Sequence, residues 1–295
     1  MPDISVVIPT YNQACFLREA IDSVFAQTLP PNEVLVVDDG STDETSHVLD
    51  LYGQRIQVIR QKNLGVSAAR NVGGFAASGD FLAFLDSDDA WLPSKLQLQM
   101  ACFLKKPSVG LVHCGCNVID DKGNVIGTKL EGGEGNILND LLLFSSGSII
   151  GCGSSALLPT KIFTEVGGYD TRLSTSADWD FSFRIANKYE IAFVRQILWK
   201  YRSHGKNMHT NIRVMEHDML LAFDKAFGLG NADILALRRR AYGTLHKVLA
   251  GSFLQTKNPI KFFYHVTKSI WYDPANLLHV LKFPISRFKN SFVAI

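Results

Sequence analysis

Short apolar runs alternate with amphipathic stretches along the first half of the chain. The apolar runs are typical of strands buried on both faces and cover residues 4–8, 33–37, 56–59 and 81–85. The stretches between them have the spacing of amphipathic helices and cover residues 14–27, 43–51 and 66–77. This repeated strand-helix order predicts an α/β fold, a Rossmann-like, mostly parallel sheet flanked by helices.

The pattern changes in the second half of the chain. Residues 109–118 predict a strand that ends in a hairpin turn, so we expect the sheet to become mixed. Further strands and helices then alternate, with strands at 153–158 and 190–194 and helices at 159–166 and 179–188. Beyond about residue 210 helical spacing dominates, at 213–227 and 232–253. We therefore predict one domain over residues 1–210 and a helical appendage over residues 211–295.

Polar residues follow three of the apolar runs directly. Ligands of a doubly wound sheet bind beyond the carboxyl ends of its strands, so these positions are the first candidates for chemistry. The residues after the first, second and fourth runs are Pro9, Thr10, Tyr11 and Asn12, then Asp38 and Asp39, then Asp86, Asp88 and Asp89. One rim of the predicted sheet therefore collects five carboxylates.

The sharpest signal is Asp86-Ser87-Asp88 at the end of a buried strand. Carboxylates spaced two residues apart can converge on one divalent cation, and the oxygens of a diphosphate can complete its shell. An isolated Asp-Ser-Asp turn is as often only a turn device, and the position after a buried strand favours the metal.

Several motifs occur in an order that resembles family-2 type inverting glycosyltransferases of the GT-A fold. They are SVVIPTYN at 5–12, QT at 27–28, EVLVVDDGSTD at 33–43, NLGVSAARN at 63–71 and the DXD motif at 86–88. The resemblance covers roughly residues 3–205. Ordered motifs of this number are more specific than a single short pattern. The resemblance implies transfer of a sugar, with inversion, from a nucleotide-diphosphate sugar to an acceptor hydroxyl.

The resemblance also implies roles for residues of the donor site. Pro9, Thr10 and Tyr11 would line the nucleoside pocket, and Asp39 would hold the base, with a UDP-sugar as the favoured donor. Arg70 would lie near the diphosphate and Asp86 near the ribose or sugar. Asp88 would bind Mg2+ or Mn2+.

Asp178 is the predicted catalytic base, because the acceptor hydroxyl must lose its proton as it attacks. It lies in a segment that resembles the family's Glu-Asp-Trp-Asp, with Ala177 in place of the first acid, and this replacement removes one carboxylate from the acceptor side. An isolated Asp at such a place is more often only the cap of the following helix, and Asp180 is the fallback base. A single base without an opposing carboxylate nucleophile favours inversion.

His204 ends a segment that resembles the family's late Tyr-Arg-x-His, where the histidine lies near the metal and the leaving diphosphate. We therefore predict it as a second metal-site residue. A lone histidine is otherwise more often a structural hydrogen-bonding residue.

The amino-acid composition indicates which partners and which cellular compartment to expect. A net charge of +2 with 20% charged residues predicts no nucleic-acid partner. Five cysteines, an odd number, and the lack of a basic leader before residue 4 favour a reducing compartment and a cytoplasmic location. From Lys257 onward six basic residues face one acid, with aromatics between them. These helices either rest on the inner membrane leaflet, near a lipid-linked acceptor, or form a packed appendage.

Two other classes stay open. A sugar nucleotidyltransferase also uses an α/β sheet with acidic metal ligands, but residues 9–12 lack the basic, glycine-rich phosphate loop typical of that class. A catalytically silent sugar-nucleotide-binding protein would keep the donor contacts and lose turnover. The resemblance favours an active transferase of surface polysaccharide, O-antigen or glycolipid synthesis, with a saccharide or lipid-linked acceptor.

Overall fold

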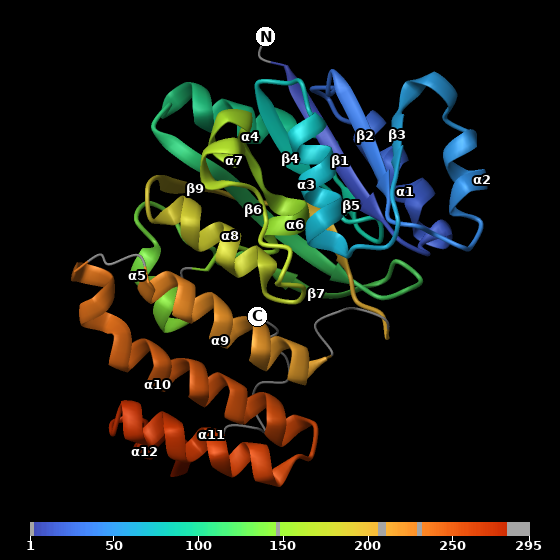
Figure 1. Cartoon of the computed structure of the whole chain (residues 1–295). Coiled ribbons are helices and arrows are strands. Elements are labelled where there is room, and N and C mark those ends of the chain that lie inside the picture. The colour runs from blue at the N-terminus through green and yellow to red at the C-terminus, as the bar shows by residue number, and fades with distance from the viewer. Residues whose placement is uncertain (1–2, 146–147, 206–210, 229–231, 282–295) are drawn as a thin grey trace. The chain divides into compact units, whose positions relative to one another are not determined.

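The computed structural model describes residues 3–145, 148–205, 211–228 and 232–281 (Figure 1). The chain divides into two compact units. Unit 1 comprises Met1–Leu141 with Ser145–Thr210, and unit 2 comprises Leu142–Phe144 with Asn211–Ile295. Each unit is described by itself below.

A single mixed sheet organises the described residues of unit 1. Its strand order is β3-β2-β1-β4-β8-β6-β9-β5, and β7 pairs with β6. β1 runs parallel to β2 and β4, whereas β8 is antiparallel to both of its neighbours, β4 and β6. The strands are β1 (Ile4–Thr10), β2 (Glu33–Asp38), β3 (Gln57–Arg60), β4 (Phe81–Phe84), β5 (Ala90–Trp91), β6 (Val109–Ile119), β7 (Val125–Lys129), β8 (Leu157–Pro159) and β9 (Glu190–Arg202). The predicted mixed α/β architecture is confirmed.

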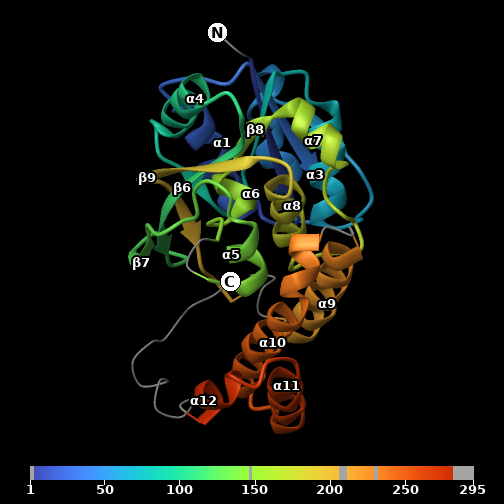
Figure 2. The same ribbon diagram turned by 90° about the vertical axis from the view of Figure 1, so that its left-hand side faces the viewer.

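Helices cover both faces of this sheet. Figure 2 shows α1 (Ala14–Phe25) and α4 (Lys95–Lys105) on one face, and α3 (Val66–Ala76), α7 (Thr160–Val166) and α8 (Ala177–Ala186) on the other. The shorter helices of unit 1 are α2 (Thr45–Asp50), α5 (Leu138–Leu143), which continues into unit 2, and α6 (Cys152–Ser155). α1 buries side chains spaced three and four residues apart, as an amphipathic helix does against a sheet: Leu17, Ala20, Ile21 and Val24.

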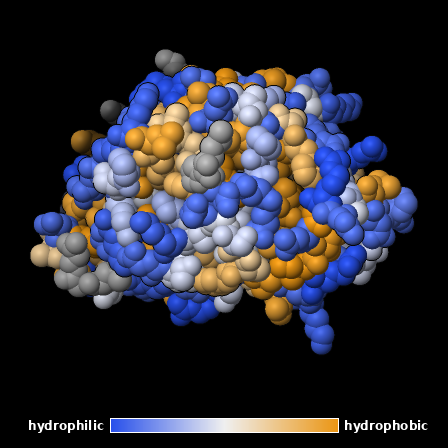
Figure 3. All heavy atoms as spheres, turned by 90° about the horizontal axis from the view of Figure 1, so that it is seen from above, coloured by the Kyte–Doolittle hydropathy of each residue, from blue (hydrophilic) through white to orange (hydrophobic). Residues whose placement is uncertain are grey.

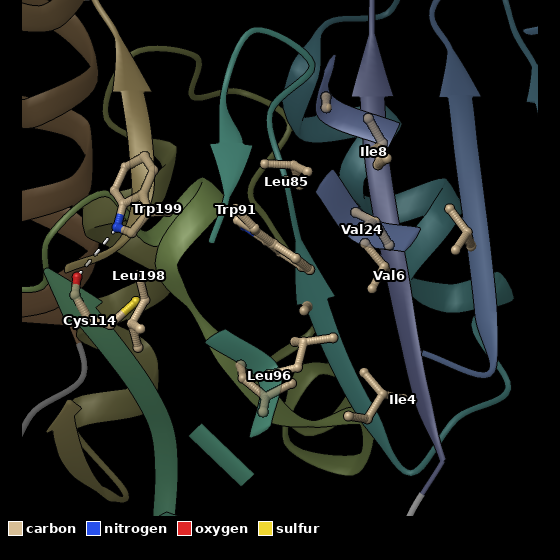
Figure 4. Packing of buried hydrophobic residues seen from close by; sticks show 14 of the residues in the cluster. Ile4, Val6, Ile8, Val24, Leu85, Trp91, Leu96, Cys114, Leu198 and Trp199 are labelled. Carbon is tan, nitrogen blue, oxygen red and sulfur yellow. Dashed lines mark hydrogen bonds between the residues drawn. The ribbon is translucent and has the colours of Figure 1, made fainter. Parts of the chain in front are cut away.

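The core of unit 1 extends from β1 and the helices beside it to β5, β6 and β9. Every residue of β1 is buried, as expected of a central parallel strand covered on both faces. Val6, Ile8, Val24, Trp91 and Leu96 belong to one hydrophobic cluster (Figure 4). On the surface, hydrophilic residues interrupt the hydrophobic ones when the molecule is seen from above (Figure 3).

Two predicted strands differ from the structure. Residues 153–155 form part of the helical turn α6 rather than a strand, because Gly151 turns the chain in the left-handed region (φ 51°) and α6 follows directly. β9 runs on to Arg202 instead of ending at residue 194. Its pairing with β6 skips Arg195 and Gln196, and this irregularity interrupts the apolar pattern along the strand.

Four helices form most of the described part of unit 2. They are α9 (Ile212–Gly228), α10 (Ala232–Gln255), α11 (Pro259–Tyr272) and α12 (Asn276–Leu281). Asn258 caps α11, since its side-chain oxygen accepts the backbone N–H of Lys261 at 3.2 Å, and Pro259 takes the first helical position. Within the described residues, none of the helices has the length and apolar character needed to cross a membrane.

Candidate functional site

The carboxyl ends of β1, β2 and β4 meet at one edge of the sheet. The backbone carbonyl of Thr10, at the end of β1, accepts the N–H of Asp39, which follows β2, at 2.9 Å. Pro9 and Thr10 are buried, whereas Tyr11 is exposed. The Thr10 hydroxyl oxygen is buried and has no hydrogen-bond partner among the described residues. Pro9 and Thr10 therefore lie on the rim, and the Thr10 hydroxyl is a buried polar group that a ligand could hydrogen-bond.

Asp39 holds together the loop that precedes α3. Its carboxylate accepts three hydrogen bonds, from Gln61 Nε2 at 2.7 Å and from the backbone N–H groups of Leu64 and Gly65 at 2.8 Å each. The sequence did not indicate this role. A carboxylate offers about four acceptor positions, so these bonds leave room for a further donor. The contact of Asp39 with a nucleobase stays a prediction.

Arg70 joins two of the predicted site acids. Nη2 lies 2.6 Å from Asp86 Oδ1, and Nη1 lies 2.9 Å from Asp178 Oδ1. The guanidinium is buried in α3, above the ring of Tyr169, and its Nε has no hydrogen-bond partner among the described residues. Asp86 and Asp178 are 92 residues apart in the chain, and one buried cation holds both at the same place.

Asp178 lies in the first turn of α8 and not at its cap, a position that Ser176 occupies. Its second oxygen accepts the backbone N–H of Gly153 at 3.0 Å. Burial raises the pKa of Asp178, and the nearby Arg70 opposes this shift without cancelling it. A carboxylate with a raised pKa accepts a proton more readily than an exposed one, which suits a general base.

Asp180, the fallback base, is paired with an arginine of its own helix. It is buried, and its carboxylate pairs with Arg184 one turn later in α8, at 2.8 Å. Arg184 also donates to the carbonyl of Gly168 at 2.7 Å. The side chain of Asp180 therefore fixes the turn before α8, and Asp178 is the acid of this segment that meets Arg70.

The loop after β4 brings Asp88 to His204. Asp88 Oδ2 lies 3.0 Å from His204 Nε2, and the imidazole stacks on Phe16 of α1 with ring centroids 5.4 Å apart. Burial and the charge of Asp86 raise the pKa of Asp88. Both predicted metal-site residues thus lie in contact, 116 positions apart in the chain.

Ser154 of α6 holds both ends of this acidic loop. Its hydroxyl oxygen accepts the N–H of Asp86 at 3.1 Å and donates to Asp89 Oδ2 at 2.6 Å. The other oxygen of Asp89 accepts the N–H of Arg202 at 2.9 Å, and Arg202 Nε donates to the carbonyl of Asp88 at 2.8 Å. The buried residues Ser154, Asp89 and Arg202 therefore position the segment Asp86-Ser87-Asp88.

Sequence reasoning missed Gly153 and Ser154, since the stretch was interpreted as a strand. A Cβ atom at Gly153 would lie 2.8 Å from Asp86 Oδ2 and still closer to Arg70 Nη2. Only glycine allows the backbone to approach these side chains so closely. The signal in the sequence was the small-residue run of 151–155, which by itself does not name a contact.

The residues at Asp88 suit a divalent cation that also binds a ligand. Among the described residues no group of three His, Cys, Asp or Glu side chains could hold a metal alone. One carboxylate oxygen and one imidazole nitrogen at 3.0 Å can converge on an ion and leave positions open for diphosphate oxygens. The carboxylate oxygen of Asp88 is a ligand type that both Mg2+ and Mn2+ accept.

One cavity of the described residues lies away from this site. It has a volume of about 600 Å³ and opens at the opposite edge of the sheet, between the first residues of β4 and β6 and the end of β8. Its lining includes Phe81, Phe103, Val109 and Pro159 and none of the predicted site residues. The chemistry of the rim therefore does not depend on this cavity.

Comparison with known proteins places this arrangement in a family. The family model "Glycosyl transferase family 2" matches residues 5–167. An uncharacterized glycosyltransferase of Rickettsia felis is 36% identical over 213 residues, which are 70% of this chain and 35% of that protein. A putative teichuronic acid biosynthesis glycosyltransferase of Bacillus subtilis, TuaG, is 34% identical over 155 residues, 51% of this chain and 60% of that one. The chain thus spans only part of these relatives.

Solved structures share the fold. The mannosyltransferase PcManGT from Pyrobaculum calidifontis, in complex with GDP-Man and Mn2+, has a TM-score of 0.63 at 20% identity, covering 98% of this chain and 83% of that one. TarS of S. aureus, in complex with UDP-GlcNAc, has a TM-score of 0.59 at 16% identity, covering 99% and 93%. At these identities the likeness supports the GT-A fold alone.

Proposed function

The chain belongs to glycosyl transferase family 2, and we propose that it moves a sugar from a nucleotide-diphosphate sugar to an acceptor hydroxyl with inversion at the anomeric carbon. The observation that carries this proposal is the contact of Arg70 with both Asp86 and Asp178. It brings a donor-side acid and an acceptor-side base to one cation at the carboxyl ends of the strands. A single displacement needs both of these groups beside the reacting atoms.

The donor is bound, in this proposal, along the rim from β1 to β4. Pro9, Thr10 and Tyr11 line the nucleoside pocket and Asp39 contacts the base, and the unsatisfied Thr10 hydroxyl supports a polar ligand here. We favour a UDP-sugar. The structural neighbour TarS binds UDP-GlcNAc and PcManGT binds GDP-Man, so both bases belong in any test.

Asp88 and His204 hold Mg2+ or Mn2+ in this proposal, with the donor diphosphate completing the shell. When bound, the metal offsets negative charge on the departing diphosphate. Arg70 adds a fixed positive charge beside Asp86, and the buried hydrogen bonds of Asp89 and Ser154 keep the acidic loop in place. Because these groups are preorganised, little rearrangement accompanies the charge that develops during transfer.

Asp178 takes the proton of the acceptor hydroxyl as the hydroxyl oxygen bonds to the anomeric carbon and the bond to the diphosphate oxygen breaks. Its raised pKa and its exposure of 35% suit this role. Asp180 is paired with Arg184 and does not offer an opposing nucleophile, which supports a single displacement and therefore inversion. Ala177, which stands where the family has an acid, is fully buried.

The acceptor we propose is a saccharide or a lipid-linked saccharide of surface polysaccharide, O-antigen or glycolipid synthesis, on the cytoplasmic side of the membrane. This proposal is supported by the relative TuaG, which is named as a putative glycosyltransferase of teichuronic acid biosynthesis. We assign residues 1–210 to the transferase domain and residues 211–295 to a helical region.

The test is product analysis with UDP- and GDP-sugars over a panel of acceptors in the presence of Mn2+. Acceptor-dependent release of the nucleoside diphosphate, with a product of inverted anomeric configuration by NMR, supports the proposal. The Asp178→Asn variant should bind the donor but release almost no nucleoside diphosphate. Retained configuration would refute the single displacement, and release of pyrophosphate from a nucleoside triphosphate would instead indicate a nucleotidyltransferase.

A further inference from the structure

Helix α11 of unit 2 turns its polar side inward and its apolar side outward. His265 and Ser269 are completely buried, whereas Ile260, Phe263 and Trp271 are 82%, 64% and 65% exposed. The exposed apolar face, defined here as Ile260, Phe263, Tyr264 and Trp271, follows the spacing of one side of a helix. An amphipathic helix of a globular domain normally buries that side.

Hydrogen bonds on the inner side fix this orientation. His265 Nε2 lies 3.1 Å from Glu216 Oε1 of α9, and His265 Nδ1 lies 2.8 Å from His246 Nδ1 of α10. The hydroxyl of Ser269 donates to the carbonyl of Gly243 at 2.7 Å. A rotation of α11 that buried its apolar side would remove these hydrogen bonds from Glu216, His246 and the carbonyl of Gly243. Buried polar groups that lose their partners destabilise the folded state.

Basic residues outnumber acids around the exposed face, and Asp273, which ends α11, is the one acid of residues 257–281. α11 contains no acidic residue, Lys257 precedes it, and Lys268 Nζ lies 5.5 Å from the ring centre of Trp271. Arg239 of α10 donates to the backbone carbonyl of Trp271 at 3.4 Å, which brings another cation to the same end. Lys261 is different, because its charge is paired with Glu216 at 2.7 Å.

We propose that the exposed apolar face of α11 docks on the surface of a bilayer that contains anionic lipid. Aromatic and aliphatic side chains beside lysines match an interfacial helix, which lies in the plane of the headgroups. With 14 residues, α11 is about 21 Å long and lies on a bilayer rather than crossing it. Leu277 and Leu278 of α12, both exposed, add apolar surface beyond Trp271.

Charge favours a bilayer over a second copy of this chain. A two-fold dimer through α11 would place the helix against its own copy, so Lys257 and Lys268 would need acids on the same surface. α11 offers none. An anionic headgroup layer supplies the missing negative charge.

Tryptophan fluorescence provides a selective readout, because the chain has four tryptophans and three of them are buried. Trp91, Trp179 and Trp199 are at most 9% exposed, against 65% for Trp271. The full chain should float with vesicles of phosphatidylcholine and phosphatidylglycerol and much less with phosphatidylcholine alone. On binding, emission should shift to shorter wavelength, and lipids brominated near the headgroup should quench it.

Variants locate the contact. The double variant Phe263→Ser with Trp271→Ser should lower the vesicle partition coefficient about a hundredfold, as expected from about one tenfold factor for each of the two lost side chains. Lys268→Gln, which removes one positive charge, should lower it about fivefold at low salt and less at high salt. The matched control is Leu104→Ser, an exposed leucine of α4 in unit 1, which should leave binding unchanged.

Four results would overturn the proposal. They are no flotation of the full chain with either vesicle, unchanged binding of the double variant, binding that is lost on removal of residues 282–295 while the double variant still binds, and self-association that the double variant abolishes without any vesicle binding. Release of nucleoside diphosphate by the variants, measured with a water-soluble acceptor, should equal that of the wild type. A failure of membrane docking is therefore separable from a failure of the transferase proposal.

Discussion

Adding one methyl group at Gly153 should separate the donor-side and acceptor-side acids. The Cβ atom that Gly153→Ala introduces would lie 2.8 Å from Asp86 Oδ2 and closer still to Arg70 Nη2. Neither side chain can move freely, because Arg70 is bonded at 2.6 Å to Asp86 and at 2.9 Å to Asp178. The backbone at Gly153 is not in the left-handed region, so the effect of Gly153→Ala is steric contact and not backbone strain.

The expected magnitude follows from the overlap. Non-bonded atoms settle at about 3.5 Å, so Arg70 or the turn α6 must shift by roughly 1 Å. Misplacement on that scale costs about a hundredfold in rate, and overpacking of this kind costs about 1–3 kcal/mol in the free energy of unfolding. Rates of acceptor-dependent nucleoside diphosphate release, together with urea unfolding, measure both quantities.

Gly127→Ala is the matched control. Gly127 lies in β7, and its Cβ would meet Val118 at an ordinary 3.7 Å. We expect wild-type transfer rates from this variant. Wild-type rates from Gly153→Ala, in a protein that unfolds at the same urea concentration, would refute the claim that transfer needs the contact of Arg70 with both acids.

Three further predictions concern single side chains. Asp178→Asn should lower the transfer rate about 10²–10⁴-fold with donor affinity unchanged by calorimetry, whereas Asp180→Asn should mainly lower stability, by about 1–3 kcal/mol. Asp39→Ala should leave three donors of the loop at residues 61–65 unsatisfied, weaken donor binding and speed hydrogen exchange there. Burial lowers the pKa of His113 to about 4, so the folded state stays neutral while the unfolded chain gains a proton below about pH 6.5. The stability from this group is complete above pH 6.5 and falls by about 2 kcal/mol by pH 5, a loss that His113→Gln should abolish in urea unfolding followed by fluorescence in a Trp271→Phe background. A transfer-competent Asp178→Asn, an unchanged loop in Asp39→Ala, or an equal pH dependence in His113→Gln would contradict the respective argument.

The sheet could be predicted from the sequence because its central strands β1 and β2 are almost entirely apolar and buried. Runs such as residues 4–8 and 33–37 are buried on both faces and are separated by amphipathic helices, so local pattern and tertiary burial agree. The same pattern predicted that the acids after β2 and β4 lie on one rim. The contact of Arg70 with Asp178 was not predictable, since it joins residues 108 positions apart.

Two features contradict what a local pattern suggests. The turn α6 was interpreted as a strand, because small residues at 151–155 have no periodicity and their conformation is set by contacts with Arg70, Asp86 and Asp89. Helix α11 has an apolar side that the pattern would place inside a core. The buried hydrogen bonds of His265 and Ser269 override that preference, and no single-helix pattern records them.

Calorimetric titration of nucleoside diphosphates with and without Mn2+ tests the central claim most directly. UDP, GDP and dTDP should be compared on the wild type and on Asp88→Ala. The account predicts that one base binds preferentially, that Mn2+ strengthens this binding, and that Asp88→Ala loses the metal dependence while it stays folded. Absence of nucleoside diphosphate binding with and without metal would contradict the donor site on this rim and, with it, the proposed transferase.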